Sequence, residues 1–415
     1  MTITDTAIIA RRAFVKSLGW MRLQPRQTQS VYGFGINVLD HGATPNARGD
    51  DTTAFQDAID STAERGGGIV LVPSGVYNVR QLRLRKRVVL QGEGWASRIV
   101  QMGGTDGSLV VLADPSVDQT IIRDLSLHGS APYQSTTNHG IYYLNEGGRF
   151  STGNARHLVQ NVLVDGCSGS GVVLHTAAGE TRIENVTARR SGLYGFDFLS
   201  RGATDCWLVS CTAQTSGRSG FRCASWATRY IGCKAFGNGQ SGVRGDGSGF
   251  LIDHPYQYLS ACDAQENHEH GFHMSQTANC ILCGCAAVSN GNTGFLLSRS
   301  NDVILEACNV AHIQLPSGLQ HAYGLDLRDG CANNVINVIV TGVSGRAMAP
   351  AAELTGNRIA IGPGSDLATW GGAGARPAVV TSEPASRLAD VVRRLPIYDG
   401  TGTLLGYIPI YDSIR

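Results

Sequence analysis

Residues 181–199 read TRIENVTARRSGLYGFDFL. Two runs in this stretch, 181–188 and 195–199, alternate between apolar and polar residues, and a polar turn containing Ser191 and Gly192 separates them. A period of two is typical of a β-strand, because successive side chains point to opposite faces. The stretch therefore predicts a strand, a polar turn and a second strand.

The same pattern recurs along the chain, each time with a glycine directly before a short apolar run. The aligned glycines are Gly140, Gly171, Gly195, Gly220, Gly242, Gly271, Gly294 and Gly324. A base period of 22 to 25 residues, with insertions in some repeats, is typical of a solenoid whose repeats share one core. We therefore expect an all-β fold, a parallel β-helix. Turn residues such as Asn238, Asn267 and Asn290 suit hydrogen bonding along such a stack.

Five of the 11 cysteines follow the repeat, at intervals of 22, 29, 23 and 23 residues: Cys211, Cys233, Cys262, Cys285 and Cys308. This spacing predicts an internal stack of free thiols, which suits folding in a reducing cytoplasm. A zinc site at Cys280, Cys283 and Cys285 is the alternative, but strand alternation would send neighbouring thiols to opposite faces. We expect no metal and no cofactor.

Composition limits the partners. The 34 basic and 33 acidic residues leave a net charge of +1, so no global field recruits nucleic acid. No apolar run reaches the eighteen or so residues of a membrane span, and we expect no membrane insertion.

The stretches 42–60 and 67–77 carry a family resemblance. The first reads GATPNARGDDTTAFQDAID and the second GGIVLVPSGVY. Together they resemble the N-terminal segment of the pectate-lyase superfamily, which includes phage tailspikes and polygalacturonase-like enzymes. The resemblance covers about residues 35 to 360, and it implies a right-handed parallel β-helix without specifying a reaction.

The two ends of the coil have their own signals. Asp51-Thr52-Thr53 is expected to cap a helix whose apolar face, which includes Phe55 and Ile59, closes the solenoid. Near-copies at 395–399 and 408–412 predict a short C-terminal β-hairpin.

These signals divide the chain into three parts. They are an N-terminal docking or helical segment at 1–30, the β-helix at 31–365, and a linker with a hairpin association tail at 366–415. Residues 10–16 faintly resemble an export signal, which is the alternative for the first part.

The second residue after each aligned glycine predicts a column of outward side chains on one sheet. Four consecutive members are polar: Asp197, Arg222, Arg244 and His273. The next outward position places Asp246 beside Arg244, about 9 to 10 Å along the stack from Asp197. We expect these five residues to be catalytic. The expected substrate-binding residues are Tyr194, Trp226, Asp253, His254, Tyr256, Asp326 and His175.

Two reaction classes fit these side chains. Hydrolysis of a glycosidic bond needs a carboxylic acid and a carboxylate, and Asp197 and Asp246 would provide them. Elimination or epimerisation of a uronic acid needs an arginine for the carboxylate and a residue that moves the C5 proton. Tyr194-Gly-Phe-Asp197 is similar to the start of the catalytic motif of alginate epimerases, which implies Tyr194 as proton carrier. Phe198-Leu199 replace the Pro-His of that motif, so the activity is not transferred.

The leading hypothesis is a tailspike-like protein on a virion tail that binds and depolymerises a bacterial surface polysaccharide, by hydrolysis rather than elimination. It would form a homotrimer and dock through residues 1–30. The alternatives are a cellular polysaccharide lyase or uronate epimerase, cytoplasmic or extracellular, and a structural or receptor-binding β-helix without catalysis.

Overall fold

The computed structural model describes residues 35–362 except 115, 145–154, 176–177, 200–202, 315–316 and 350–355, together with the backbone of three later strands. The predicted docking segment 1–30 lies outside the described residues. Within the described part of the chain, no helix is both long and apolar enough to cross a membrane.

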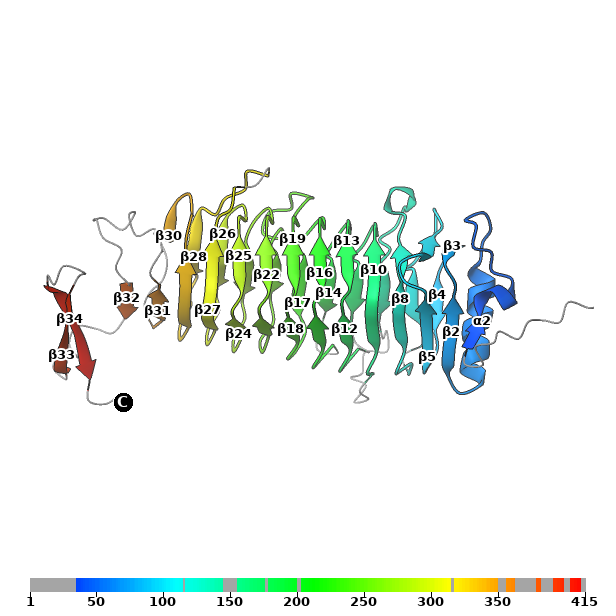
Figure 1. Cartoon of the computed structure of the whole chain (residues 1–415), viewed down its shortest axis with the longest axis horizontal. Coiled ribbons are helices and arrows are strands. Elements are labelled where there is room, and N and C mark those ends of the chain that lie inside the picture. The colour runs from blue at the N-terminus through cyan, green and yellow to red at the C-terminus, as the bar shows by residue number, and fades with distance from the viewer. Residues whose placement is uncertain are drawn as a thin grey trace, which may run out of the picture.

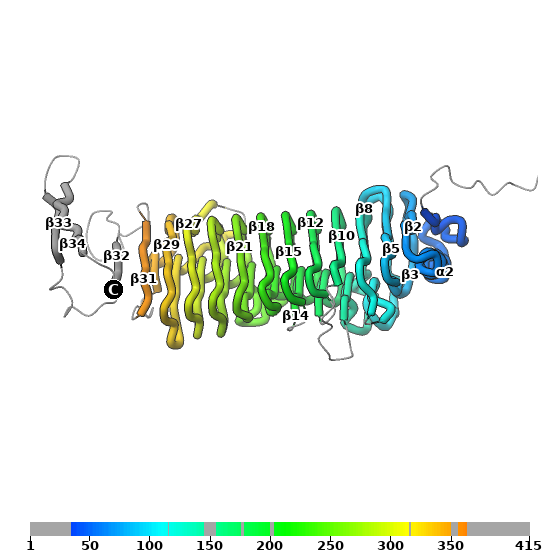
Figure 2. The backbone as a smooth tube through the Cα atoms, turned by 90° about the horizontal axis from the view of Figure 1, so that it is seen from below, coloured from blue at the N-terminus to red at the C-terminus, as the bar shows by residue number. Residues whose placement is uncertain are grey.

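The chain winds into a stack of coils along one long axis, with helix α2 (Thr52–Glu64) at the N-terminal end (Figures 1 and 2). One face is a parallel sheet of 11 strands. Its strands are β4 (Leu82–Leu84), β7 (Val110–Leu112), β9 (Ile141–Tyr143), β11 (Val172–Leu174), β14 (Phe196–Leu199), β17 (Phe221–Ala224), β20 (Phe250–Ile252), β23 (Phe272–Ser275), β26 (Thr293–Ser298), β28 (Tyr323–Arg328) and β30 (Arg346–Met348).

The remaining faces belong to a sheet of 21 strands. These are β1 (Gly35–Asn37), β2 (Gly68–Val72), β3 (Gly75–Val79), β5 (Val88–Gly92), β6 (Ser97–Gln101), β8 (Ile121–His128), β10 (Leu158–Asp165), β12 (Arg182–Glu184), β13 (Thr187–Arg189), β15 (Trp207–Val209), β16 (Thr212–Gln214), β18 (Arg229–Ile231), β19 (Lys234–Phe236), β21 (Tyr258–Ser260), β22 (Asp263–Gln265), β24 (Ile281–Cys283), β25 (Ala286–Val288), β27 (Ile304–Ala311), β29 (Val335–Val340), β31 (Arg358–Ile361) and β32 (Ala378–Thr381). Short 3-10 turns lie at Val38–His41 and Ala131–Tyr133.

The quoted stretch 181–199 shows how a winding is built. Its second run is strand β14, as predicted, but its first run is two strands, β12 and β13. Asn185 separates them with a left-handed backbone, φ 51°, which turns the chain through a corner between two faces. Asparagine tolerates that conformation, so the alternating pattern continues across the corner.

A file of stacked phenylalanines runs through the core. Neighbouring ring centroids of Phe196, Phe221, Phe250, Phe272 and Phe295 lie 4.6 to 4.9 Å apart, with interplanar angles of 3 to 6°. This spacing equals the distance between hydrogen-bonded strands, so each winding adds one ring to the file. The stack confirms that strands from successive windings lie in register.

Two further ladders run inside the coil. Asn238 Nδ2 donates to Asn267 Oδ1, and Asn267 Nδ2 donates to Asn290 Oδ1, each at 2.8 Å. This confirms the predicted hydrogen bonding along the stack. The five repeat cysteines, Cys211 to Cys308, are free and at most 1% exposed, which confirms the predicted internal thiol stack. Burial raises the pKa of the Cys233 and Cys262 thiols well above the ordinary value, which disfavours reactive thiolate.

Helix α2 buries the predicted apolar face, including Phe55 and Ile59, and Phe55 contacts the Tyr77 ring edge-on at 5.2 Å. Asp51 is the N-cap residue of α2, as predicted, but its side chain makes no capping hydrogen bond. Its carboxylate instead accepts hydrogen bonds from the backbone N–H groups of Thr44 and Asn78, because it is buried against the first windings.

The chain beyond the coil includes β33 (Val391–Tyr398) and β34 (Leu404–Tyr411), which pair antiparallel. They contain most of both near-copies, as the predicted hairpin requires. Strand β32 pairs antiparallel with β31.

Candidate functional site

The 11-stranded sheet carries most of the predicted outward column. Strand pairing aligns Tyr142, Val173, Asp197, Arg222, Leu251, His273, Leu296 and Asp326 across eight windings. The prediction is confirmed for every member except Arg244.

Arg244 is not in the column, and its predicted place there is wrong. Arg222 pairs with Leu251 of β20, because the repeat glycine of this winding is Gly249 and not Gly242. Gly242 has a left-handed φ of 67° and lies in an inserted loop, residues 239–247. Arg244 is exposed on that loop.

The predicted strand position of Asp246 is wrong for the same reason, yet the loop returns its carboxylate to the sheet. Tyr194 Oη donates to Asp246 Oδ2 at 2.6 Å, and Ser219 Oγ donates to Oδ1 at 3.0 Å. Arg218 Nη1 donates to Oδ2 at 3.2 Å. Asp246 therefore joins the side chains of two preceding windings.

The loop is itself fastened to the next winding. Both carboxylate oxygens of Glu269 accept hydrogen bonds from backbone N–H groups, one from Gly245 at 2.5 Å and one from Gly247 at 3.0 Å. The backbone N–H of Glu269 donates to the Gly247 carbonyl at 3.1 Å. Glu269 thus holds the loop on both sides of Asp246.

Asp197 is a buried acid of the column, only 4% exposed. Burial raises its pKa to about 7, against the lowering effect of Arg222, while the charges of Asp253 and Asp246 raise it further. Oδ2 accepts a long hydrogen bond from Ser170 at 3.5 Å, and Oδ1 accepts none from the described residues. The carboxyl group can therefore carry a proton near neutral pH.

Arg222 links two carboxyl groups. Its Nη1 lies 3.9 Å from Asp197 Oδ1, and its Nε lies 3.3 Å from Asp253 Oδ2. Asp253 follows β20 directly. It occupies the position relative to the repeat glycine Gly249 that the sequence alignment on Gly242 had given to Asp246. The guanidinium groups of Arg222 and Arg218 also lie 5.6 and 5.7 Å from the centre of the Tyr194 ring.

Tyr194 lies between these groups. Burial and the neighbouring Asp246 raise the pKa of its phenol to about 12, so the hydroxyl keeps its proton at neutral pH. Its contact with two arginines and an acid gives it the most charged surroundings of any described aromatic residue in the site.

Two histidines lie on the winding of β23, next to the winding that carries Asp246. His273 is in the column, and the His270 ring centroid lies 5.3 Å from it. Burial lowers the pKa of His273 to about 4 and of His270 to about 3, so both rings are neutral at pH 7. Neither Nδ1 has a hydrogen-bond partner among the described residues.

The other predicted residues lie at the margins. Trp226, His254 and Tyr256 form an aromatic cluster beyond the ends of β17 and β20, with Trp226 4.7 Å from His254 and 5.7 Å from Tyr256 between ring centroids. Asp326 is 1% exposed and accepts a 2.5 Å hydrogen bond from Arg328 Nε. His175 follows β11, and burial lowers its pKa. We define the candidate site as Tyr194, Asp197, Arg218, Ser219, Arg222, Asp246, Asp253, His270 and His273.

Sequence reasoning missed Arg218, Ser219 and Ser170. Ser170, Tyr194, Ser219 and His270 each stand directly before a repeat glycine, and all four turn toward the same site. A column read at that position would have found Ser170 and Ser219. Nothing in the repeat indicates Arg218, whose long side chain reaches across a winding.

The fold and these side chains define a parallel β-helix with a polar site on one sheet. A family model described as right handed beta helix region matches residues 230–359, and a model described as rhamnogalacturonase A/epimerase, pectate lyase-like matches residues 35–244. The chain therefore belongs to the rhamnogalacturonase A/epimerase, pectate lyase-like family, as the sequence resemblance predicted.

Solved structures share the fold. The A-module of the mannuronan C-5 epimerase AlgE4 from Azotobacter vinelandii has 22% identity and a TM-score of 0.59 over 80% of this chain and 89% of that chain. The enzymatically active domain of bacteriophage CBA120 tailspike protein 2 has 16% identity and a TM-score of 0.63, over 74% of this chain and 48% of that chain.

Curated relatives match over shorter stretches. Alginate lyase 7 of Azotobacter vinelandii is 32% identical over 107 residues, which is 23% of this chain and 12% of that protein. The plasmin and fibronectin-binding protein A of Streptococcus pneumoniae is 29% identical over 144 residues. The matches span only 12% and 20% of the lengths of these two relatives.

Proposed function

We propose that this protein binds an extended polysaccharide along the 11-stranded sheet and hydrolyses its glycosidic bonds. The observation that carries the proposal is that the acids of the site differ in their surroundings. Asp197 is buried and has a pKa of about 7, whereas Asp253 accepts a hydrogen bond from Arg222 and Asp246 accepts one from Tyr194. Hydrolysis requires one protonated carboxyl group and one carboxylate.

In this proposal Asp197 protonates the leaving glycosidic oxygen, and Asp253 activates water. The guanidinium group of Arg222 lies near both carboxyl groups and separates them. An inverting glycosidase needs about 6.5 to 9.5 Å between its carboxyl groups to admit a water molecule. Asp246 and Tyr194 would then hold sugar hydroxyls beside the reacting bond.

A second candidate is elimination or epimerisation at a uronic acid, which the surroundings of Tyr194 favour. Arg218 and Arg222 could neutralise a sugar carboxylate, and the phenol, with its pKa of about 12, would donate a proton rather than remove one. Local sequence similarity to an alginate lyase agrees with this candidate.

Product masses distinguish the two reactions. Purified protein is incubated with a panel of neutral and uronate-containing bacterial surface polysaccharides, and the products are analysed by mass spectrometry in H₂¹⁸O. Hydrolysis adds one labelled water for each cleaved bond. An unsaturated uronate without added water supports the second candidate instead, as does an unchanged mass with C5 inverted in the ¹H NMR spectrum. Unchanged polymer across the panel contradicts both.

Single substitutions assign the roles. Asp197→Asn and Asp253→Asn should each abolish hydrolysis, whereas Tyr194→Phe should weaken it only moderately. If the reaction is elimination, Tyr194→Phe becomes the most damaging of the three. Arg244→Ala is the matched control, because Arg244 is exposed and outside the column.

We also propose that the protein works as a tailspike-like homotrimer on a virion tail, docking through residues 1–30. The fold shared with a bacteriophage tailspike and the buried free thiols support this setting. The domain boundaries at 30 and 365 belong to the same proposal.

A further inference from the structure

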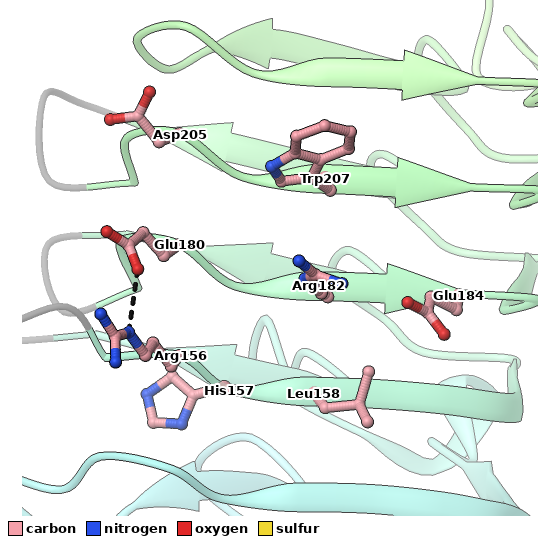
Figure 3. A pocket seen from close by; sticks show the side chains of 8 residues that line it. All are labelled: Arg156, His157, Leu158, Glu180, Arg182, Glu184, Asp205 and Trp207. Atoms are coloured by element: carbon pink, nitrogen blue, oxygen red, sulfur yellow. Dashed lines mark hydrogen bonds and ion pairs between the residues drawn. The ribbon is translucent and has the colours of Figure 1, made fainter.

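A groove of about 630 Å³ lies on the outer side of the 21-stranded sheet, outside the candidate site on the 11-stranded sheet (Figure 3). Strands β10, β12 and β15 and the turns before them form it, so three successive windings contribute. Its polar and aromatic lining includes Arg156, Glu180, Arg182, Glu184, Asp205 and Trp207. The proposed reaction uses none of these residues.

The floor of the groove is a column of outward side chains. Leu158, Arg182 and Trp207 are neighbours in strand register. The guanidinium groups of Arg182 and Arg229 lie 6.0 and 4.8 Å from the Trp207 ring centre. The indole is therefore held on the surface between two cations, partly exposed on an outward face of the coil.

The rim is a second column, made by the residue that lies two positions before each strand. Arg156, Glu180 and Asp205 share a left-handed backbone with φ of 49°, 55° and 54°, which marks one equivalent position in three windings. Arg156 Nε donates to Glu180 Oε2 at 2.9 Å. Asp205 has no ion-pair partner among the described residues, although it follows Glu180 by one winding.

The placement of these acids points to a ligand that donates hydrogen bonds. Like charges at neighbouring positions of a sheet repel each other, and Arg156 compensates only one of the two carboxylates. Vicinal hydroxyl groups would donate to both. The C–H groups of a sugar ring would pack on the part of the Trp207 indole that the two guanidinium groups leave exposed.

We propose that this groove is a secondary binding site for a neutral hexose unit of an oligosaccharide. The two neighbouring carboxylates of the rim, Glu180 and Asp205, disfavour an acidic sugar there. A volume of this size accommodates a short oligosaccharide. A site on the side of the coil would keep a long polymer attached while its other segments meet the 11-stranded sheet, which raises the effective concentration of substrate.

Binding of neutral hexaoses of glucose, mannose and galactose to the full chain tests the proposal, by calorimetry and by tryptophan fluorescence. At least one hexaose should bind, and Trp207→Ala should weaken its affinity about tenfold or more. Trp95→Ala is the matched control, because Trp95 is 51% exposed in a turn outside the groove and should leave affinity unchanged.

A second variant guards against misfolding. The double variant Glu180→Gln, Asp205→Asn should bind the same hexaose with lower affinity. Its Tm should stay constant or rise, because charge repulsion between the two carboxylates is removed. Equal affinity in the parent, Trp207→Ala and double-variant proteins would overturn the proposal, as would failure of all three hexaoses to bind. Binding of Ca²⁺ without any hexaose would also overturn it.

The result is separable from the proposed hydrolysis. Asp197→Asn, inactive by design, should bind the hexaose like the parent protein. If the parent cleaves no polysaccharide but loses hexaose binding on Trp207→Ala, this inference stands while the proposed function fails. If cleavage occurs and hexaose binding is insensitive to Trp207, only this inference fails.

Discussion

Asp197 illustrates how one residue acquires chemistry from its place in a stack. Ordinary aspartates are ionised at neutral pH, but the strand position of Asp197 leaves it 4% exposed beneath the neighbouring windings. Desolvation outweighs the cation at Arg222, and the pKa rises to about 7. A surface aspartate with the same sequence neighbours would lack this property.

Asp197→Asn should lower kcat for polysaccharide cleavage about 10² to 10⁴-fold, because the variant cannot supply a proton to the leaving group. In the parent protein, kcat should fall as pH rises through about 7, where the acid loses that proton. Initial rates from pH 5 to 9 measure both effects. An alkaline limb that persists in a still-active variant would contradict this role.

At the scale of elements, the 239–247 loop decides the composition of the site. It displaces the expected repeat glycine by seven residues, from Gly242 to Gly249, and carries Asp246 to Tyr194. The loop ends approach closely, since a Cβ on Gly239 would lie 2.8 Å from Gly247 Cα. Glycine is required there both for this approach and for its φ of 91°.

The register of this winding can be tested by stability. Phe250→Ala should lower the free energy of unfolding by about 3 to 5 kcal/mol, because it removes one ring from the buried file. Val243→Ala should change it by less than about 0.5 kcal/mol, since Val243 is 45% exposed on the loop. Denaturant unfolding of both variants provides the comparison. The reverse order of effects would restore the alignment on Gly242.

Glu269 is expected to be a positioning residue. Glu269→Ala should reduce kcat about tenfold or more by releasing the loop that presents Asp246, with little change in KM if sugar binding relies on the rest of the face. Glu269→Gln keeps one acceptor oxygen and should restore part of the activity. Steady-state kinetics of the two variants check this. Equal loss in both, together with a lower Tm, would indicate a structural role only.

At the scale of the whole molecule, the coil buries histidines that must stay neutral. Burial lowers the pKa of five of them to between about 3 and 4: His128, His139, His270, His273 and His321. Their folded pKa lies below the ordinary value of 6.5. Each therefore contributes stability that is present above pH 6.5 and is lost as pH falls toward 4.

The Tm should accordingly decrease steadily from pH 7 to pH 4.5, as the unfolded chain takes up protons that the folded chain cannot. Asp197 opposes this trend, because its raised pKa favours the folded state at lower pH. Thermal unfolding at several pH values measures the balance. Replacing His270 by Gln should reduce the slope. A Tm that is constant or rises on acidification would contradict the histidine argument.

The proposed assembly also belongs to this scale. Multi-angle light scattering of the full chain should give three times the 44.0 kDa chain mass. Deleting residues 366–415 should reduce the trimer fraction if the tail strands take part in association. A monomer across the micromolar range would remove the tailspike setting without affecting the chemistry of the 11-stranded sheet.

The sequence by itself determined the coil, because period-two alternation and glycine spacing report directly on local backbone geometry and on which face is buried. The thiol stack and the family could be predicted from it. The alignment failed only at Gly242, where an inserted loop offered a second glycine followed by an apolar residue.

Only the tertiary structure decided the site. Tyr194 and Asp246 are 52 residues apart in sequence yet lie 2.6 Å apart. Their contact depends on how far each winding is displaced and on where a loop folds back, and neither is encoded in a local period. Arg218 and Glu269 escaped prediction for the same reason: long side chains bond across windings, and no repeat position reports their reach.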